Sequence, residues 1–495
     1  MRYPEFLRHR YRDILGYTGL IMTFVGLLIL SPLLCLPFYG NEIDSIWGFL
    51  GTGITVLLLG LSLSRLVTHD EPFNLTSQEG FVIIVFSWSF AIVSCAAPFW
   101  FVLKLSLTKA IFESTSGWTT TGLSVVDVTT APRMVLLYRS ILQFSGGAGF
   151  AIIMLSALAG PAGTALATAE GRNSQLVPNI KRSAKLVLSM YICYALGGVV
   201  LFRFTGMDLF DAINHSLAAV STGGFSTRVE SIGHWNNPLI EAVAVALMLL
   251  GSTNFFTSYL LFRGKFIPVW RNSELRLEWT LIFFFVPLVL FSVALSTYPG
   301  LDKALRVAIF ETVSAATTTG FSTVGYENWS ALGLYGLILL MLIGGGTGST
   351  AGGLKQYRVY ILFRGLLWEF RRLLLPPKAI TEPDVWHGER RFFISDEENR
   401  HACLYAFLYF TFFALGVMIL SAYGYPFVES AFEFASSIGT VGLSVGITSA
   451  QTPEGVLWIQ IFGMLLGRLE FFAIIVGLIK LIRDLHAMIS SKQMS

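Results

Sequence analysis

The chain has little charge for its length. Only 13% of its 495 residues are Asp, Glu, Lys or Arg, and 54% are hydrophobic, whereas a soluble protein carries about 25% charged residues. The apolar residues form blocks of roughly 20 or more, the length that crosses the hydrocarbon core of a bilayer as a helix. Strands of a membrane β-barrel would be only about ten residues long and would alternate in polarity. The composition therefore predicts an all-α polytopic membrane protein.

Cysteines and catalytic motifs are also scarce. The four cysteines, Cys35, Cys95, Cys193 and Cys403, all fall in apolar segments, so no disulfide framework and no metal site is predicted. HExxH and a GxGxxG motif in a βαβ unit are missing, and no GxSxG motif lies within the apolar spans, so we expect neither an enzyme nor a cofactor in this chain. The net charge of +3 gives no reason to expect nucleic acid as a partner.

The chain begins with a basic stretch, residues 1–12, which is followed by a full-length apolar segment. This pattern favours a first membrane helix over a cleaved signal peptide. Further apolar segments follow to the end of the chain. The expected spans are 15–38, 45–67, 79–106, 133–158, 183–205, 238–262, 278–298, 331–373, 401–423 and 454–482.

The spans are organised as an N-terminal hairpin followed by four repeats. In each repeat a span leads into a shorter semi-apolar segment, then a strip of small hydroxyl residues and glycine, then a loop and a second span. Internal repeats of this kind determine the fold. The predicted regions are 1–70 for the two-helix hairpin, 71–165, 166–265 and 266–375 for repeats 1 to 3, 376–400 for a charged insert and 401–495 for repeat 4.

Each strip ends in Gly-(Leu/Phe)-Ser, and landmarks around it recur in phase. The residue nine positions before the last strip glycine is Glu113, His215, Glu311 or Glu433, and a further glycine follows 24–27 positions later, at Gly146, Gly251, Gly344 or Gly467. The candidate ion-binding residues are Thr120, Thr121 and Gly122; Thr222, Gly223 and Gly224; Thr318, Thr319 and Gly320; and Thr440, Val441 and Gly442.

The strips suit a site that removes water from a cation. Backbone carbonyls and threonine hydroxyls can replace a hydration shell, and glycine permits the unusual backbone angles needed close to an axis. One such strip would more often serve helix packing, but four in register predict a selectivity filter. Most of the 34 basic residues fall on the side of the N-terminus, so that side is expected to be cytoplasmic. The strips then lie on the outer side, on re-entrant segments.

The four strips, the repeats and the extra N-terminal hairpin resemble the Trk/Ktr/HKT superfamily of potassium transporters, most closely the bacterial TrkH type, over nearly the whole chain. The resemblance implies four membrane–pore-loop–membrane units around one pseudo-fourfold pore in the bacterial inner membrane. Some plant relatives that select sodium have serine in place of the first filter glycine, so Gly122 favours K⁺ as the transported ion. The second strip, Thr222-Gly223-Gly224, departs from the Thr-Thr-Gly form.

The resemblance also implies partners. Members of the family form homodimers and are regulated by a separate cytosolic ring protein of TrkA type that binds NAD(H) or ATP. The charged insert at 376–400 is a candidate docking surface, with a plain solvated loop as the alternative. Membrane lipid is expected around the spans.

The second span of repeat 3 contains six glycines near its middle. Because each glycine costs about 1 kcal/mol inside a helix, we predict a broken helix, with close helix packing as the alternative. Leu354 follows Gly353, which excludes a phosphate-binding loop. In the family this segment is an intramembrane loop that obstructs the pore. The candidate gate residues are Gly344, Gly345, Gly346, Thr347, Gly348, Gly352, Gly353 and Arg468.

Arg468 lies near the middle of the expected span 454–482, too deep for its charge to reach the membrane surface. It is either part of a structural ion pair or a cation beside the pore, and the family carries a basic residue at this position. Glu113, Glu311 and Glu433 are interpreted as braces behind the filter rather than as ion ligands, because His215 breaks the symmetry of a carboxylate ring.

The leading hypothesis is a potassium uptake protein with channel-like conduction. A symporter that couples K⁺ to Na⁺ or H⁺ by alternating access is the first alternative, because broken helices also mark transporters; no obvious proton relay supports coupling to H⁺. A membrane enzyme is the second alternative, and no motif favours it.

Overall fold

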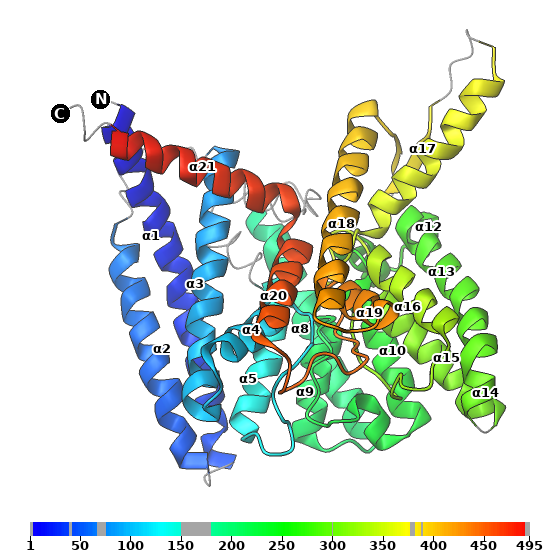
Figure 1. Cartoon of the computed structure of the whole chain (residues 1–495), viewed down its shortest axis with the longest axis horizontal. Helices are drawn as coiled ribbons and strands as arrows, with labels where there is room; N and C mark the ends of the chain where they lie inside the picture. Colours follow the sequence, from blue (N-terminus) through cyan, green and yellow to red (C-terminus); the bar gives the residue numbers. More distant parts are fainter. Residues whose placement is uncertain are drawn as a thin grey trace. The chain divides into compact units, whose positions relative to one another are not determined.

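The structure is a computed structural model that describes residues 3–38, 42–66, 76–149, 180–298, 300–376, 382–387 and 390–490. Most of these residues are helical (Figure 1). Among them, six helical segments are long and apolar enough to cross a membrane, or seven if a bent pair counts as one span. They contain α1 (Tyr3–Leu30), α2 (Ile43–Ser64), α3 (Ser77–Leu103), α8 (Ile180–Phe204), α13 (Ser273–Val289) and α18 (Asp396–Ala422). The prediction of a polytopic helical membrane protein is confirmed.

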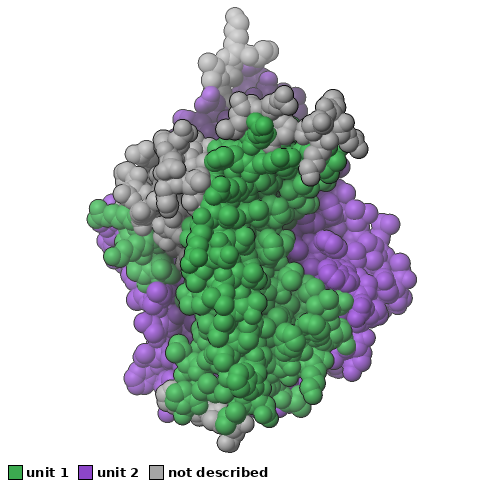
Figure 2. Space-filling view, turned by 90° about the vertical axis from the view of Figure 1, so that its left-hand side faces the viewer, with its two compact units in different colours: residues 1–118, 130–189, 469–495 green, residues 119–129, 190–468 purple. Residues whose placement is uncertain are grey.

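The chain divides into two compact units, which Figure 2 colours separately. The first consists of residues 1–118, 130–189 and 469–495, and the second of residues 119–129 and 190–468. In the first unit α1 and α2 form the predicted hairpin. Their backbones meet at glycines: a Cβ on Gly19 would overlap Leu63, and one on Gly26 would overlap Leu57. Small residues at such positions let membrane helices approach closely.

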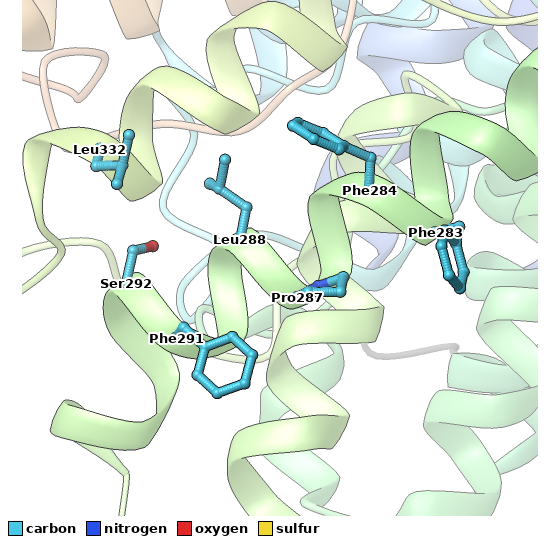
Figure 3. A pocket seen from close by; sticks show the side chains of 7 residues that line it. All are labelled: Phe283, Phe284, Pro287, Leu288, Phe291, Ser292 and Leu332. Carbon is cyan, nitrogen blue, oxygen red and sulfur yellow. The ribbon is translucent and has the colours of Figure 1, made fainter.

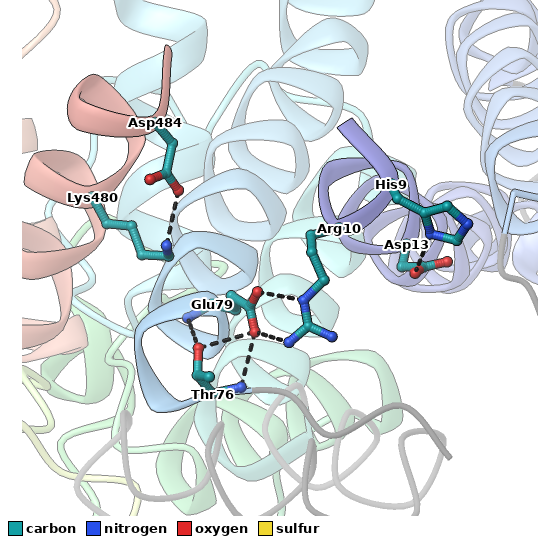
Figure 4. Close-up of polar contacts among 7 residues, drawn as sticks. All are labelled: His9, Arg10, Asp13, Thr76, Glu79, Lys480 and Asp484. Carbon is teal, nitrogen blue, oxygen red and sulfur yellow. Dashed lines mark hydrogen bonds and ion pairs between the residues drawn. The ribbon is translucent and has the colours of Figure 1, made fainter. Parts of the chain in front are cut away.

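Polar contacts tie α1 to the start of α3 (Figure 4). Arg10 donates to both carboxylate oxygens of Glu79, at 2.7 and 2.6 Å. Glu79 also belongs to the N-terminal capping box of α3, because the Thr76 side chain accepts a hydrogen bond from its backbone amide. A bidentate arginine–carboxylate contact is strong and directional. It therefore fixes the register of the hairpin against α3.

The expected span at 238–262 is sharply bent in the structure. α10 (Pro238–Ser252) and α11 (Phe255–Phe262) meet at an angle of 114°. The Asn254 side chain accepts from the amide of Phe256 and so caps the new helix. Asparagine competes for backbone hydrogen bonds in this way, which makes the bend stable within an apolar sequence.

The last expected span, 454–482, is also not continuous. α20 (Glu454–Leu469) ends before Glu470, whose φ is 60°, and α21 (Phe471–Ser490) begins after it. Arg468 therefore lies in the last turn of α20 and not near the middle of a long helix. In the first repeat, α5 (Arg133–Phe144) passes into one π-helical turn at Ser145–Gly149; the remainder of the expected span 133–158 lies outside the described residues.

The second span of repeat 3 is broken as predicted. α16 (Ala331–Ile343) and α17 (Gln356–Leu374) flank a segment at 344–355 that is not helical. Within it, Gly344, Gly348 and Gly353 have φ of 73, 70 and 79°. Glycine adopts these left-handed angles without the steric cost that a side chain brings. The run of glycines thus makes the break possible.

The charged insert forms a short β-ribbon, which was not predicted. β1 (Asp384–His387) pairs antiparallel with β2 (Arg390–Phe393). Asp384 accepts from Arg364 of α17 at 2.7 Å and from Arg391 at 2.8 Å. The Arg391 hydrogen bond, followed by the charges of both arginines, lowers the pKa of the Asp384 carboxyl. The described part of the insert is therefore tied to α17 rather than being a plain solvated loop.

An apolar face of the second unit is hollowed by a pocket of about 600 Å³ (Figure 3). Phe283, Phe284 and Phe291 lie along its lining on α13 and the π-helical turn that follows, and all three are exposed. Exposed aromatic side chains in a patch of this kind mark an interaction surface. On a chain of this composition the surface suits contact with hydrocarbon.

Candidate functional site: a ring of four strips

Four short helices each end at one of the strips. They are α4 (Leu107–Trp118), α9 (Leu209–Val220), α15 (Leu301–Ala316) and α19 (Phe427–Ile438). None is long enough to cross a bilayer alone. Each leads into a non-helical strip, and all four strips belong to the second unit. The predicted alternation of short helix and strip is present in every repeat.

The four strips share one backbone conformation. A threonine in the left-handed region comes first, with φ of 55, 50, 53 and 50° at Thr120, Thr222, Thr318 and Thr440. Two positions later the glycine again has positive φ: 96, 72, 81 and 104° at Gly122, Gly224, Gly320 and Gly442. The residue between them is not in this region. A β-branched residue with positive φ is an outlier that surrounding structure must hold in place, and here it recurs four times.

Contacts between the strips close into a ring. A Cβ built on any of the four glycines would overlap a carbonyl oxygen of the next strip. The pairs run in one direction round the ring: Gly122 against Gly223, Gly224 against Thr319, Gly320 against Val441, and Gly442 against Thr121. The carbonyl in each pair is that of the residue just before the next glycine. The ring thus brings all twelve predicted ion-binding residues to one place and leaves no room for a side chain at its glycines.

Buried carboxylates brace the strips in repeats 3 and 4. Glu311 accepts from the amide and hydroxyl of Thr323, at 2.8 and 2.9 Å, and from the Tyr326 hydroxyl at 2.5 Å. Glu433 does the same for Ser444 at 2.8 Å and for the amide of Thr448 at 3.0 Å. Both glutamates are fully buried. They hold the chain that leaves the strip against the helix that enters it, as the interpretation as braces requires.

Repeats 1 and 2 use other partners at the same position. His215 is fully buried, with Nδ1 2.8 Å from the Asp211 carbonyl and Nε2 2.9 Å from Ser226 Oγ. Glu113 forms a buried ion pair with Arg139 of α5 at 2.7 Å. Arg139 is not among the residues predicted from the sequence. The signal was available, because an arginine inside an apolar span requires a partner.

Three of the four later glycines have a common role. A Cβ on Gly146, Gly251 or Gly467 would overlap the carbonyl of the last residue of the short helix in the same repeat, at Trp118, Val220 or Ile438. The second span of these repeats therefore passes directly against the end of the short helix. Gly344 differs, since its nearest atoms belong to Gly352 and Gly353, and this exception coincides with the broken helix.

The glycine-rich segment at 344–353 contacts three of the four strips. The amide of Gly352 donates to Thr318 Oγ1 at 2.8 Å, and a Cβ on Gly352 would overlap Thr440 Oγ1. Thr350 Oγ1 lies 3.1 Å from Thr222 Oγ1 and donates to the Gly251 carbonyl at 2.9 Å. The hydroxyls involved belong to the left-handed threonines. The segment is therefore packed directly against the ring on its threonine side.

Arg468 holds this segment from another direction. Its Nη1 donates to the Thr350 carbonyl at 2.5 Å. A charged donor on a carbonyl forms a stronger bond than a neutral one. The sequence placed Arg468 and the glycine-rich segment in different repeats, and the fold joins them.

The left-handed threonines present buried hydroxyls. All four are inaccessible, and Thr120 Oγ1 and Thr440 Oγ1 make no hydrogen bond within the described residues. A buried hydroxyl without a partner is costly. Such groups suit a ring that supplies oxygen ligands.

Comparison with known proteins identifies the family. Residues 49–262 and 256–485 match the model of the TrkH family, which is described as a cation transport protein. The chain belongs to the TrkH family. Because this family consists of transport proteins, the expectation that the chain is not an enzyme is confirmed.

Relatives of the TrkH family match over almost their full length. The chain is 32% identical to the Trk system potassium uptake protein TrkG of Escherichia coli, over 94% of this chain and 97% of that protein. It is 31% identical to the TrkH protein of the same organism, over 94% and 98%. The crystal structure of the potassium transporter TrkH from Vibrio parahaemolyticus superposes with a TM-score of 0.80 at 27% identity, covering 94% of this chain and 98% of that one.

Proposed function

We propose that this protein takes up K⁺ through the ring of four strips. The relatives named above are potassium uptake proteins, and the ring provides the chemistry that such a role needs. Carbonyl oxygens of four strips converge where glycines remove all side-chain bulk. At this place neutral protein oxygens can replace the water molecules that hydrate the ion. The closed ring of glycine–carbonyl pairs is the observation that carries this proposal.

In this proposal the filter consists of the residues at 120–122, 222–224, 318–320 and 440–442. The repeated φ signs alternate along each strip, which lets successive carbonyls face one side. The buried glutamates and His215 stand outside the ligand set, because their oxygens and nitrogens are engaged by the chain behind the strips. Their role is to keep the strips rigid, and rigidity is what allows discrimination between ions of different radius.

We place the gate at Gly344–Gly353 and Arg468. The segment lies against the threonine hydroxyls of three strips, where it would block an ion that leaves the ring. Glycines at this position give the segment freedom to adopt a second conformation. The Arg468 guanidinium adds a positive charge next to the segment, which raises the barrier to a cation.

The names of the relatives also suggest the assembly. They are components of a Trk system, and we propose that this chain works with a cytosolic NAD(H)- or ATP-binding ring of TrkA type as a homodimer in the bacterial inner membrane. The N-terminus is then cytoplasmic. The regions predicted from the sequence act as a hairpin, four pore repeats and an insert on which the cytosolic regulatory protein docks.

The first test is ion selectivity in proteoliposomes. Uptake of Rb⁺ and Na⁺ is measured for the wild type and for Gly122→Ser. We expect the wild type to prefer Rb⁺ and the variant to lose that preference, because a serine side chain would displace the Gly223 carbonyl. Thr129→Ser, at an exposed position in the loop after the same strip, is the control. Equal uptake of both ions by wild type and Gly122→Ser would refute a selective ring.

A further inference from the structure

α13 carries a buried carboxylate that has no part in the proposed filter or gate. It borders the proposed gate segment, Gly344–Gly353. Glu278 is only 2% exposed, and a hydrogen bond of 2.7 Å joins its Oε1 to Ser252 Oγ. It makes no ion pair within the described part of the chain. An isolated ionised carboxylate in such surroundings is expensive, and the group either acquires a cation or is neutral.

Glu278 separates two cavities. On one side is a small polar cavity of about 10 Å³ that it lines together with Ser252, Asn254, Glu274, Gly346 and Gln356. On the other is an apolar pocket of about 650 Å³ that includes Leu249, Trp270 and Trp279. Of the described residues that line the two cavities, two are carboxylates and none is basic. Neutralisation by a lysine or arginine is therefore not provided here.

The small cavity has room for one water molecule, and a second group points to one. Gln356 is 1% exposed, and its Nε2 has no hydrogen-bond partner within the described residues. An amide N–H needs an acceptor, and a water oxygen next to Glu278 supplies it. A bare metal cation would not, because it accepts no hydrogen bond. The donor thus favours a water and a proton over a metal ion.

The hydrogen bonds of Ser252 also favour a protonated Glu278. Ser252 Oγ is within donating distance of two acceptors, the Leu249 carbonyl at 3.1 Å and Glu278 Oε1 at 2.7 Å. A hydroxyl has one hydrogen. If that hydrogen goes to the carbonyl, which can only accept, the shorter contact needs a hydrogen on the glutamate. A carboxylic acid at Glu278 satisfies both contacts in full.

We propose that Glu278 is a proton-binding site whose occupancy holds the gate segment in place. The neutral acid donates to Ser252 Oγ, and one water in the small cavity bridges its other oxygen to Gln356 Nε2. The ligand is a single proton, and its release leaves a carboxylate in a buried cavity that already contains Glu274.

Two backbone amides of the gate segment donate hydrogen bonds to residues of this site. The amide of Gly346 donates to the carbonyl of Ser252 at 3.0 Å, and the amide of Thr347 donates to Glu274 Oε1 at 2.7 Å. Loss of the proton leaves the single Ser252 hydrogen to serve both the Leu249 carbonyl and a carboxylate, and it sets two negative charges one helical turn apart. Both anchors of the segment then lie beside an unfavourable pair of charges.

The other ionisable groups nearby do not neutralise Glu278. Glu274, on the same helix, is of like charge. On α17, Tyr357 interacts electrostatically with Glu274. Lys355, just before α17, donates to the Ala351 carbonyl in the gate segment. The lining residues from α10, α11 and the gate segment are not ionisable.

One test reads the proton directly and does not depend on transport. Infrared spectra of wild type and Glu278→Gln are compared near neutral pH in H₂O and D₂O. The difference is expected to contain one carboxylic-acid C=O band that shifts in D₂O. Glu241→Gln is the matched control: Glu241 is also buried but is paired with Arg306, so its difference spectrum should show carboxylate bands instead. The lack of an acid band for Glu278 would overturn the proposal.

A second test reads the effect on the gate and rests on the proposed uptake function. Rb⁺ flux is measured in proteoliposomes with equal pH on both sides. The wild-type flux should rise with pH, by no more than about tenfold per pH unit, which is the limit for one proton. Glu278→Gln, which mimics the acid, should stay at the low-pH level, and Glu241→Gln should keep the rise. An acid band together with an unchanged pH profile in Glu278→Gln would refute control of the gate while leaving the uptake function intact.

Discussion

At the scale of single residues, the ring depends on glycines that no other residue can replace. Each of the four glycines combines positive φ with a carbonyl from the next strip where a Cβ would lie. Any side chain at these positions would clash with that carbonyl and would also be strained by the left-handed backbone, which alone costs about 1–2 kcal/mol. The threonines two positions earlier have the same backbone strain in the native protein, and the contacts that surround them must offset it.

We therefore expect Gly320→Ala to abolish selective uptake and to lower thermal stability, because its Cβ would collide with the Val441 carbonyl. Gly325→Ala is the matched control. Gly325 follows the same strip, has no positive φ and has open space at its Cβ position, so this variant should behave as wild type. The readouts are Rb⁺ uptake and the melting temperature in detergent. Normal Rb⁺ uptake by Gly320→Ala would contradict the ring.

The bracing carboxylates are also a matter of single residues. Glu311→Ala should lower the melting temperature and weaken Rb⁺ over Na⁺ selectivity, since it leaves the donors of Thr323 and Tyr326 buried and unsatisfied, at about 1–3 kcal/mol each. Glu327→Ala, at an exposed position in the following loop, is the control and should change neither property. An ion ligand at Glu311 would instead give lower uptake with unchanged stability.

At the scale of elements, the repeated unit is a short helix, a strip and a second span, and the third repeat departs from it. In the others a glycine of the second span lies against the end of the short helix, whereas the segment after Ile343 packs against the strips of repeats 2, 3 and 4. Arg468, at the end of α20, binds this segment at the Thr350 carbonyl. One element thus connects repeats 2, 3 and 4.

Arg468→Ala should raise basal Rb⁺ flux several-fold, because the gate segment loses a charged tether and a nearby positive charge. Arg468→Lys keeps the positive charge but replaces the planar guanidinium by one ammonium group on a flexible chain. An intermediate flux is therefore expected. Flux in proteoliposomes and retained melting temperature are the measurements. Reduced flux with normal folding in Arg468→Ala would show that the arginine assists conduction instead of hindering it.

At the scale of the whole molecule, the distribution of basic residues predicts the orientation in the membrane. In this prediction the insert, which carries the ribbon of β1 and β2, lies on the side rich in Lys and Arg, and the loops that leave the strips lie on the opposite side. Positive charge on short loops is retained in the cytoplasm. The two faces of the protein should therefore differ in access from outside the cell.

Single cysteines in a cysteine-free background test this orientation. In intact cells, a membrane-impermeant maleimide should label Val229→Cys, which follows the second strip and is exposed, and should not label Glu382→Cys in the insert. Both should react after the cells are opened, which controls for accessibility. Labelling of Glu382→Cys in intact cells would reverse the predicted topology.

The sequence by itself determined the class of protein, the four repeats and the ring residues. Apolar length and the scarcity of charge are enough for membrane helices, and the recurrence of Gly122, Gly224, Gly320 and Gly442 in phase requires one shared geometry. The broken helix of repeat 3 also followed from local propensity, because six glycines cannot sustain a helix.

The tertiary structure decided what local patterns cannot express. Apolar length alone predicts one span at 238–262 and one at 454–482, but the Asn254 cap bends the first and the positive φ of Glu470 interrupts the second. The pairing of Glu113 with Arg139 and of Arg468 with Thr350, and the isolation of Glu278 between two cavities, likewise arise from segments far apart in the chain. A sequence shows which groups are polar, but only the fold shows which other groups are close enough to satisfy them.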